Sequence, residues 1–336
     1  MRTVAVVGAT GLVGREMCRV LEARAFPLDG LRLFSSPRSA GTEVVVAGQP
    51  RRVEDAATAD LSGIDIALFA AGSDASRALA PRFVAAGATV IDNSSAFRED
   101  PAVPLIVPEI NAAALLAGPC PIVANPNCST IIMLMAVAPL HRRFGATRVI
   151  VSTYQSVSGA GKAARDELFD QAAAFGRGEP GPVQVYDRPI FMNLIPQIGD
   201  GDEGSLCVEE RKMVAETHKI LGTSSIAIYP TTVRVPVERC HSMSVHVEFG
   251  RAATREEVLA AFADMPGLRY VAGDSAVKWP TPRELSGSFE TQVGRLRAAG
   301  AGGTGWMFWV VSDQLLKGAA LNAVQIAEML VQAGRT

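Results

Sequence analysis

The sequence lacks any segment dense in lysine and arginine, and the formal net charge of its 336 residues is only −2. Proteins that bind nucleic acids or anionic membranes rely on such positive charge, so we expect small-molecule substrates instead. No apolar run reaches the roughly 18 residues that a membrane-spanning helix requires. No charged-then-apolar leader precedes the first predicted strand. These absences predict a cytosolic protein that binds no membrane.

Cysteine is also scarce, and its five copies are scattered, without CxxC spacing. Neither a disulfide framework nor a structural zinc site is therefore indicated, and we expect no metal. The 48% of hydrophobic and 20% of charged residues are typical of a globular protein. The length suggests roughly two domains, each large enough to bury a core.

A glycine-rich turn follows the first predicted strand. The apolar run at residues 4–7 precedes GATGLVG at residues 8–14 and then a helical pattern through about residue 23. This is the order of a dinucleotide-binding unit, in which glycines allow close approach to a pyrophosphate and the helix N-terminus donates N–H groups. Glycine turns also arise for packing reasons, which is the alternative. The candidate cofactor contacts are Gly8, Thr10, Gly11, Leu12 and Val13.

The loop after the second predicted strand, residues 31–34, bears on cofactor choice. NAD-specific sites usually place an acidic residue there to bind the ribose 2′-hydroxyl. Here the loop instead carries Ser36, Arg38 and Ser39, which suit a 2′-phosphate. The sequence therefore predicts NADP, with an ordinary polar turn as the alternative.

Strands and helices continue to alternate up to the middle of the chain. Residues 64–70 and 88–91 have strand patterns, and residues 75–86 between them have a helical one. This alternation predicts an α/β fold with a parallel sheet and a ligand beyond the carboxyl ends of the strands. In one such strand-end loop, Arg98 could bind an anion or could simply be a solvated surface arginine.

Cys128 is the candidate nucleophile. It follows a predicted strand at residues 120–124 and an Asn-Pro-Asn turn, and it precedes a helical apolar run at residues 131–140. Free N–H groups and the helix dipole at such a junction favour a thiolate. The alternative is a buried cysteine that acts as a small hydrophobe.

The second half of the chain holds further polar candidates. Glu209 and Lys212 share a face of a predicted helix, where a solvated ion pair is the ordinary interpretation. Arg234 and His241 lie near the same end of two predicted strands, and His241 is either a proton-transfer group or a structural histidine. The predicted elements here are strands 148–155, 225–235, 243–249, 293–297 and 306–311, a small-residue turn at 156–162 that opens a helix, and helices 208–221, 251–265 and 314–332.

Together these segments resemble the aspartate-semialdehyde dehydrogenase family almost from end to end. The resemblance rests on residues 8–14, 36–41, 91–98, 125–130, 154–161, 209–212, 234–237, 241–242 and 317–325. It implies a Rossmann-type NADP-binding domain at residues 1–127 and an α+β catalytic and dimerisation domain at residues 128–313. It also implies a C-terminal helix, residues 314–336, that returns to the first domain, and a homodimer.

The resemblance also assigns roles to matching positions. The implied roles are Cys128 as nucleophile, His241 as acid/base, Gln155 and Arg234 as orienters of the amino-acid end, Glu209 on the substrate amino group, Arg98 and Lys212 on the phosphate, Asn127 in substrate binding, and Ser158, Gly159 and Gln325 as cofactor contacts. The implied reaction is the NADPH-dependent reductive dephosphorylation of aspartyl phosphate through a cysteine thioester. Cys240 stands where the family usually has glycine. Either the turn does not need a positive φ or the pose of the histidine differs.

Two rival functions stay open at this stage. N-acetylglutamyl-phosphate reductases share the architecture, but their nucleophile typically follows Asn-Pro-Gly, whereas Asn127 precedes Cys128 here. A non-catalytic paralogue would be expected to lose the nucleophile or the acid/base residue, and this chain retains both Cys128 and His241.

Overall fold

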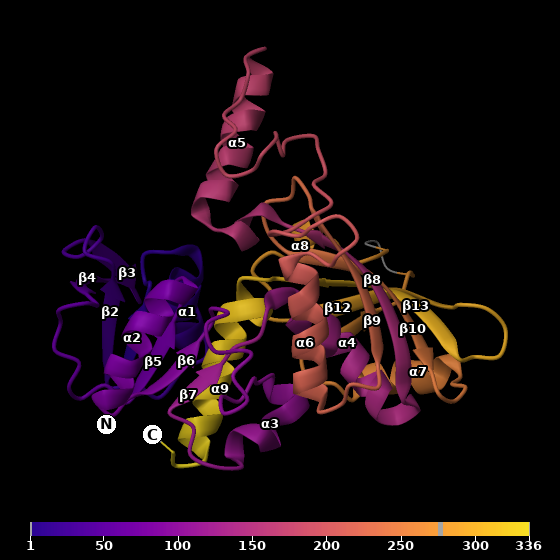
Figure 1. Ribbon diagram of the computed structural model, residues 1–336, viewed down its shortest axis with the longest axis horizontal. Helices are drawn as coiled ribbons and strands as arrows, with labels where there is room; N and C mark the ends of the chain where they lie inside the picture. Colours follow the sequence, from indigo (N-terminus) through magenta and orange to yellow (C-terminus); the bar gives the residue numbers. More distant parts are fainter. Residues whose placement is uncertain (1, 275–277, 336) are drawn as a thin grey trace. The chain divides into compact units, whose positions relative to one another are not determined.

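The computed structural model describes residues 2–274 and 278–335 (Figure 1). The chain divides into two compact units. The first, unit 1, comprises Met1–Asn127 together with Gly318–Thr336, and the second, unit 2, comprises Cys128–Lys317. Within the described residues, no helix is both long and apolar enough to cross a membrane.

Unit 1 is built around a seven-stranded sheet with the strand order β3-β4-β2-β1-β5-β6-β7. All neighbouring strands are parallel except β3 and β4. The predicted Rossmann-type fold is thereby confirmed. The strands are β1 (Thr3–Val7), β2 (Gly30–Ser35), β3 (Glu43–Val46), β4 (Gln49–Asp55), β5 (Ile66–Phe69), β6 (Thr89–Asp92) and β7 (Ile122–Ala124).

The hairpin of β3 and β4 is not among the predicted elements. Its two-residue loop, Ala47 and Gly48, adopts positive φ at both positions (51° and 72°). Such turns favour Asn-Gly or Asp-Gly, so the Ala-Gly pair gives only a weak signal in the sequence.

The described residues of unit 1 also form the helices α1 (Leu12–Ala23), α2 (Ser73–Ala85), α3 (Pro108–Leu116) and α9 (Leu321–Gln332). Phe83 of α2 packs edge-on against Phe34 and Phe69 of the sheet, with ring centroids 5.6 and 5.2 Å apart. Helix α9 packs beside α1, where Arg24 and Glu328 form an ion pair of 2.6 Å. The helix predicted over residues 314–332 is largely present, but its first turn, Leu316–Ala320, is π-helical and α9 begins only at Leu321. Gly318, a poor helix former, lies within that turn.

Unit 2 contains a mixed six-stranded sheet with the order β11-β12-β13-β10-β8-β9. Strand β10 is antiparallel to β13 and β8, and β8 is parallel to β9. The strands are β8 (Ala146–Gln155), β9 (Ala227–Arg234), β10 (His241–Phe249), β11 (Leu268–Val271), β12 (Thr291–Ala298) and β13 (Gly305–Ser312).

Helix α4 (Cys128–Phe144) forms the core of unit 2, and every residue from Ser129 to Leu140 is buried. It packs against β8, β10, β12 and β13, and α6 (Val208–Leu221) and α7 (Arg255–Ala263) lie beside it. Helix α5 (Lys162–Gly176) projects from the rest of unit 2 together with the loop that follows it (Figure 1). The described part of unit 2 also contains α8 (Pro282–Leu285) and a 3₁₀ turn at Val157–Ala160.

Strand register in unit 2 brings three polar residues together at one end of the neighbouring strands β8, β9 and β10. Gln155 pairs with Arg234 at the carboxyl ends of the parallel strands β8 and β9. Strand β10 runs antiparallel to β8, so its first residue, His241, lies at the same end of the sheet. The next residue, Ser242, pairs with Tyr154 of β8.

Candidate active site

Cys128 is the first residue of α4 and follows the short strand β7 after an Asn-Pro-Asn turn. The predicted strand-to-helix junction is therefore present. The first N–H groups of a helix have no intrahelical partner, and they carry the positive end of the dipole. The cysteine is half-buried, unlike the fully buried residues that follow it in α4. Its position suits a nucleophile better than it suits a core residue.

His241 lies against Cys128, although 113 residues separate the two in the chain. The Nε2 atom of the fully buried ring is 3.4 Å from the sulfur of Cys128. The Nδ1 atom is 3.1 Å from both the backbone nitrogen and the hydroxyl oxygen of Ser156. Burial, reinforced by the nearby charge of Arg234, holds the pKa of His241 well below its usual value.

Arg234 supplies a buried positive charge beside this pair. Its side chain is 6% exposed, and Nη1 donates a 2.6 Å hydrogen bond to the carbonyl oxygen of Ser156. Its Nε is buried without a partner, and no carboxylate pairs with the guanidinium in the described part of the chain. Because a buried charge without a counterion is costly, this arrangement suits an anionic ligand group.

Glu209 and Gln155 extend the group formed by Cys128, His241 and Arg234, and these five residues are called the cysteine–histidine cluster below. Glu209 is 7% exposed, and its carboxylate accepts hydrogen bonds of 3.3 Å from the Gln155 amide and the Ser129 hydroxyl. The interpretation of Glu209 and Lys212 as a solvated ion pair is therefore wrong, because tertiary packing turns the carboxylate inward. Lys212 is half-buried and forms no hydrogen bond or ion pair with the residues described.

Gly159 contacts the histidine and arginine directly. A Cβ atom at this position would lie 3.0 Å from Cε1 of His241 and 3.2 Å from Nη1 of Arg234. The neighbouring Ser158 is buried, and its hydroxyl donates to the carbonyl oxygen of Glu238 and accepts from Gln314 at 2.8 Å. The turn thus leaves no room for a side chain against the ring.

Cys240 has a φ of 72°, in the left-handed region that favours glycine. The turn before His241 therefore does require a positive φ, and a cysteine adopts it at some cost in strain. Burial raises the pKa of its thiol, and its side chain packs against Leu285 and Val311. Its N–H donates a 2.7 Å hydrogen bond to Gln314, which ties the turn to the segment after β13.

The glycine-rich turn of unit 1 is shaped by the backbone. Gly8 has a φ of +87°, and a Cβ there would lie 2.6 Å from the carbonyl oxygen of Ala70. A Cβ at Gly14 would lie only 2.2 Å from the carbonyl oxygen of Gly8. Helix α1 begins at Leu12 and Val13 after Gly11, and no side chain caps its N-terminus. These N–H groups and the glycine cradle fit the pyrophosphate of a dinucleotide.

The loop after β2 offers positive charge and hydroxyl groups, as expected from the sequence. Arg38 is exposed and has no ion pair among the described residues, and Ser36 and Ser39 lie close to it in the chain. At the same end of the sheet, the hydroxyl groups of Thr10 and Ser35 are 3.1 Å apart. This loop fits a ribose that carries a phosphate.

The remaining candidates also belong to unit 1. Arg98 is only 8% exposed, and its guanidinium donates to the carbonyl oxygens of Asn125 (2.9 Å) and Asn93 (2.6 Å). The alternative of a solvated surface arginine is therefore wrong. Asn127 is buried, and Gln325 of α9 donates a 2.9 Å hydrogen bond to Glu109.

Two polar residues that contact the cluster are not among the site residues that the sequence predicts. Ser129 and Ser156 contact Glu209 and His241, respectively, but serine is common in turns and at helix starts. Each stands next to a candidate residue, Cys128 or Gln155, and this proximity was the available signal. Among the residues described, no group of three or more His, Cys, Asp or Glu side chains is placed to hold a metal.

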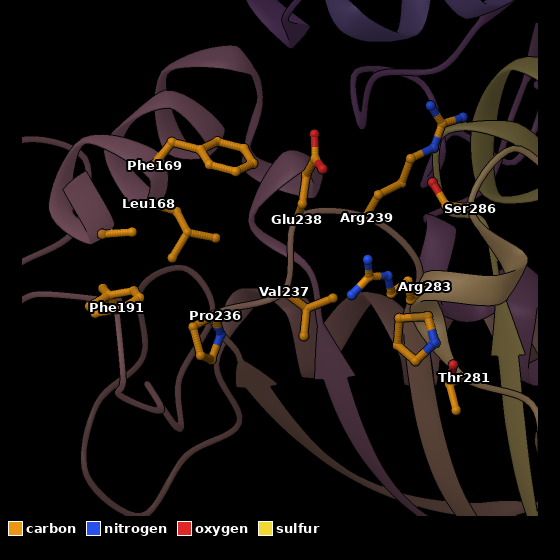
Figure 2. Close-up of a pocket in the computed structure, with 12 residues that line it drawn as sticks. Leu168, Phe169, Phe191, Pro236, Val237, Glu238, Arg239, Thr281, Arg283 and Ser286 are labelled. Carbon is orange, nitrogen blue, oxygen red and sulfur yellow. The ribbon is translucent and has the colours of Figure 1, made fainter. Parts of the chain in front are cut away.

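A separate cavity of about 800 Å³ lies in unit 2 beside the segment that joins β9 to β10. Figure 2 shows Leu168, Phe169 and Phe191 on one side and Arg239 and Arg283 on the other. None of the sequence-predicted site residues lines it. It is therefore distinct from the cysteine–histidine cluster.

Comparison with known proteins gives consistent matches. Residues 3–117 match the family model described as "Semialdehyde dehydrogenase, NAD binding domain", and residues 137–317 match "Semialdehyde dehydrogenase, dimerisation domain". An aspartate-semialdehyde dehydrogenase from Bacillus subtilis is 45% identical, with 97% of this chain and 96% of the relative covered. Aspartate-semialdehyde dehydrogenase 2 of Vibrio cholerae is 44% identical, with 98% and 97% covered.

Solved structures agree with these matches. The crystal structure of aspartate semialdehyde dehydrogenase II from Vibrio cholerae, complexed with ASA, has a TM-score of 0.95 and 43% identity, with 99% of this chain and 98% of that chain covered. An aspartate semialdehyde dehydrogenase with NADP from Candida albicans has a TM-score of 0.76 and covers 100% of both chains. At 22% identity, the latter supports the fold alone.

Proposed function

The chain belongs to the aspartate-semialdehyde dehydrogenase family, and we propose that it catalyses the NADPH-dependent reduction of L-aspartyl 4-phosphate to L-aspartate 4-semialdehyde and phosphate. This reaction belongs to lysine, threonine and methionine biosynthesis. The observation that carries the proposal is the contact of 3.4 Å between Cys128 and His241 beside the uncompensated charge of Arg234. A nucleophile, an imidazole and a carboxylate-binding cation are the groups that an amino-acid acyl phosphate requires.

The chemistry follows from these side chains. The thiolate of Cys128 attacks the acyl carbon, the bond from carbon to the phosphate oxygen breaks, and a thioester remains on the enzyme. Arg98 and Lys212 are proposed to bind the departing phosphate, and Arg234 with Gln155 to orient the α-carboxylate end. Glu209 is proposed to bind the α-amino group, because a buried carboxylate next to a cationic group would be stabilised.

A bound nicotinamide dinucleotide supplies the hydride that reduces the thioester carbon. The residues that we propose hold it are Gly8, Thr10, Gly11, Leu12, Val13, Ser36, Arg38, Ser39, Ser158, Gly159 and Gln325. The positive loop after β2 supports NADP rather than NAD as the form bound. When the resulting hemithioacetal collapses, the aldehyde leaves and Cys128 is regenerated.

The rival reductase specificity is less well supported. Asn127 before Cys128 differs from the glycine expected in N-acetylglutamyl-phosphate reductases, and the curated relatives are named for aspartate semialdehyde. The intact contact between Cys128 and His241 argues against a non-catalytic paralogue.

The decisive experiment measures phosphate-dependent reduction of NADP with two aldehydes under identical conditions. We expect aspartate semialdehyde to be oxidised efficiently and N-acetylglutamate semialdehyde to react at least about 10³-fold more slowly, because Arg234 and Glu209 match a free amino acid. A preference for the acetylated aldehyde would overturn the proposed substrate.

We also propose a homodimer formed through the open face of the unit 2 sheet. One line of register across four strands places Tyr229, Ile150, His246 and Met307 side by side. Tyr229 and Ile150 are 56% and 43% exposed, which is unusual for large apolar side chains in neighbouring strands. Sedimentation of the wild type and of an Ile150→Asp/Tyr229→Asp variant tests this, with a dimer and a monomer expected, respectively.

The cytosolic location remains a prediction from the sequence.

A further inference from the structure

We propose that the backbone N–H of Ser156 is a positioning group that holds His241 in the tautomer with its proton on Nε2. The ring then donates a hydrogen bond to the sulfur of Cys128 and cannot accept the proton of the thiol. This inference rests on the proposed function. It keeps Cys128 as the nucleophile, replaces the acid/base role that the family resemblance implies for His241 with hydrogen-bond donation from Nε2, and adds Ser156 as a positioning residue.

The donor and acceptor pattern around Nδ1 decides the tautomer. A backbone N–H can only donate, and that of Ser156 lies 3.1 Å from Nδ1 with hydrogen-bond geometry. Nδ1 must therefore present its lone pair, which leaves Nε2 to carry the proton of a neutral imidazole. Nε2 is the atom that faces the sulfur of Cys128, at 3.4 Å.

The opposite orientation of the ring is disfavoured. It would place a C–H group against the N–H of Ser156, a residue that is 0% exposed. In the described part of the chain this N–H has no other acceptor, so it would be buried and unsatisfied. A buried donor that loses its acceptor is strongly unfavourable.

The doubly protonated ring is disfavoured as well. Its additional proton would lie on Nδ1 and face the fixed N–H donor of Ser156. Arg234 at the end of β9 is the charged group that acts on the ring, and the sulfur of Cys128 at the start of α4 faces Nε2. Burial and repulsion from Arg234 keep the pKa of His241 well below its usual value, which agrees with a neutral ring.

The hydroxyl of Ser156 behaves differently from the N–H. It also lies 3.1 Å from Nδ1, but it can rotate to donate to a lone pair or to accept from an N–H group. It therefore tolerates either tautomer and cannot select between them. The main-chain N–H alone makes the selection, and a serine-to-alanine substitution leaves that group in place.

The tautomer changes the role of the histidine. When the hemithioacetal anion collapses, an oxygen lone pair forms the C=O bond, the C–S bond breaks, and its electron pair returns to the sulfur of Cys128. The atoms and electrons of this step balance without the transfer of a proton. The Nε2–H group stabilises the departing thiolate, or the oxyanion before it, by donating a hydrogen bond.

Nitrogen NMR of the resting protein tests the tautomer without substrate or cofactor. The protein would be labelled with ¹⁵N-histidine, and the signals of residue 241 identified by their loss in His241→Gln; the sequence holds only four histidines. We expect a protonated Nε2 and an unprotonated Nδ1 at about pH 7, both in the wild type and in Ser156→Ala. A proton on Nδ1 in the wild type, or a change of tautomer in Ser156→Ala, would overturn the proposal.

A pair of substitutions tests the donor role. The side-chain amide of glutamine can donate from near the Nε2 position but cannot accept a proton at neutral pH. We expect His241→Gln to retain at least about tenfold higher kcat/KM than His241→Ala, provided that both variants melt at similar temperatures. Equal activity of the two would contradict the donor role.

These measurements separate the inference from the proposed function. If the wild type reduces NADP with aspartate semialdehyde but carries its proton on Nδ1, the inference fails and the function stands. If the proton is on Nε2 but neither aldehyde reacts, the function fails and the placement of the proton stands.

Discussion

The cofactor turn of unit 1 and the cysteine–histidine cluster of unit 2 are built from different parts of the chain. The turn uses backbone atoms within residues 8–14, where the glycines make room for close approach. The cluster uses side chains from α4, α6 and the ends of β8, β9 and β10. A backbone site is therefore encoded locally, whereas a side-chain site depends on strand register and helix packing.

This difference predicts different weaknesses. In the turn, steric conflict would involve carbonyl groups that cannot move without moving the sheet. In the cluster, a side chain at Gly159 would conflict with the side chains of His241 and Arg234, which can shift while the fold persists. Substitutions in the first region should mainly affect folding, and those in the second should mainly affect catalysis.

The largest effect is expected from removing the nucleophile. Cys128→Ala should lower kcat by at least about 10³-fold, because no other group can form the thioester. Cys120→Ala provides the control, since Cys120 is half-buried just before β7 and its sulfur donates a hydrogen bond only to the carbonyl oxygen of Leu115 among the described residues. Steady-state rates of both variants with aspartate semialdehyde check this. Substantial turnover by Cys128→Ala would contradict the role of Cys128.

Two glycine substitutions test the comparison directly. Gly14→Ala would place a Cβ 2.2 Å from a carbonyl oxygen, and we expect it to destabilise unit 1 by about 1–3 kcal/mol or more. Gly159→Ala would press on His241 and Arg234, and we expect about a 10²-fold loss of kcat/KM. Thermal melting and kinetics should separate the two effects.

Gly176→Ala serves as the control for both substitutions. Gly176 lies at the end of α5, with open space around its Cβ position and no positive φ. The Gly176→Ala variant should have wild-type activity and be at least as stable as the wild type, because alanine is the better helix former. A Gly159→Ala variant that is fully active would show that the ring and the guanidinium are free to move apart.

A smaller effect is expected in the loop after β2. Arg38→Ala should raise the KM for NADP by about tenfold while the KM for NAD changes little, because only NADP carries the 2′-phosphate. The ratio of the KM for NADP to the KM for NAD serves as the control, because general damage to the protein would raise both values. An equal change for both cofactors would contradict a 2′-phosphate contact at Arg38.

The smallest effect concerns stability and pH. The pKa of folded His241 lies below the usual value of about 6.5, so the unfolded chain binds a proton first as the pH falls. This residue should therefore cost stability below about pH 6.5, by at most about 1.4 kcal/mol per pH unit. Urea unfolding of the wild type and of His241→Gln between about pH 5 and pH 8 should show the steeper loss in the wild type. Parallel curves would contradict a buried neutral ring.

Much of the first unit was predictable because its signals are local. Apolar strands, a glycine turn and alternating helices predict the parallel sheet without any distant contact. The hairpin of β3 and β4 was missed because its Ala-Gly turn lacks the usual residues. The π-helical turn before α9 was missed because hydrophobic periodicity does not distinguish it from a regular helix.

The five residues of the cluster were predictable, but Ser129, Ser156 and the contacts between the side chains were not. The family resemblance selects Cys128, Gln155, Arg234 and His241, and the register of β8, β9 and β10 brings the last three to one edge of the sheet. The sequence offers no reason for Glu209 to turn away from Lys212. Only the packing of α6 beside α4 places that carboxylate against Gln155 and Ser129.

The sequence by itself determined the two-part fold class, the glycine cradle and the helix-start position of Cys128, because each depends on neighbouring residues. The tertiary structure decided how the turn before His241 is made, with Cys240 at a positive φ, and which ring nitrogen meets Ser156. Those features depend on atoms that lie far apart in the chain and meet only when the unit 2 sheet forms. Local sequence patterns contain no information about such distances.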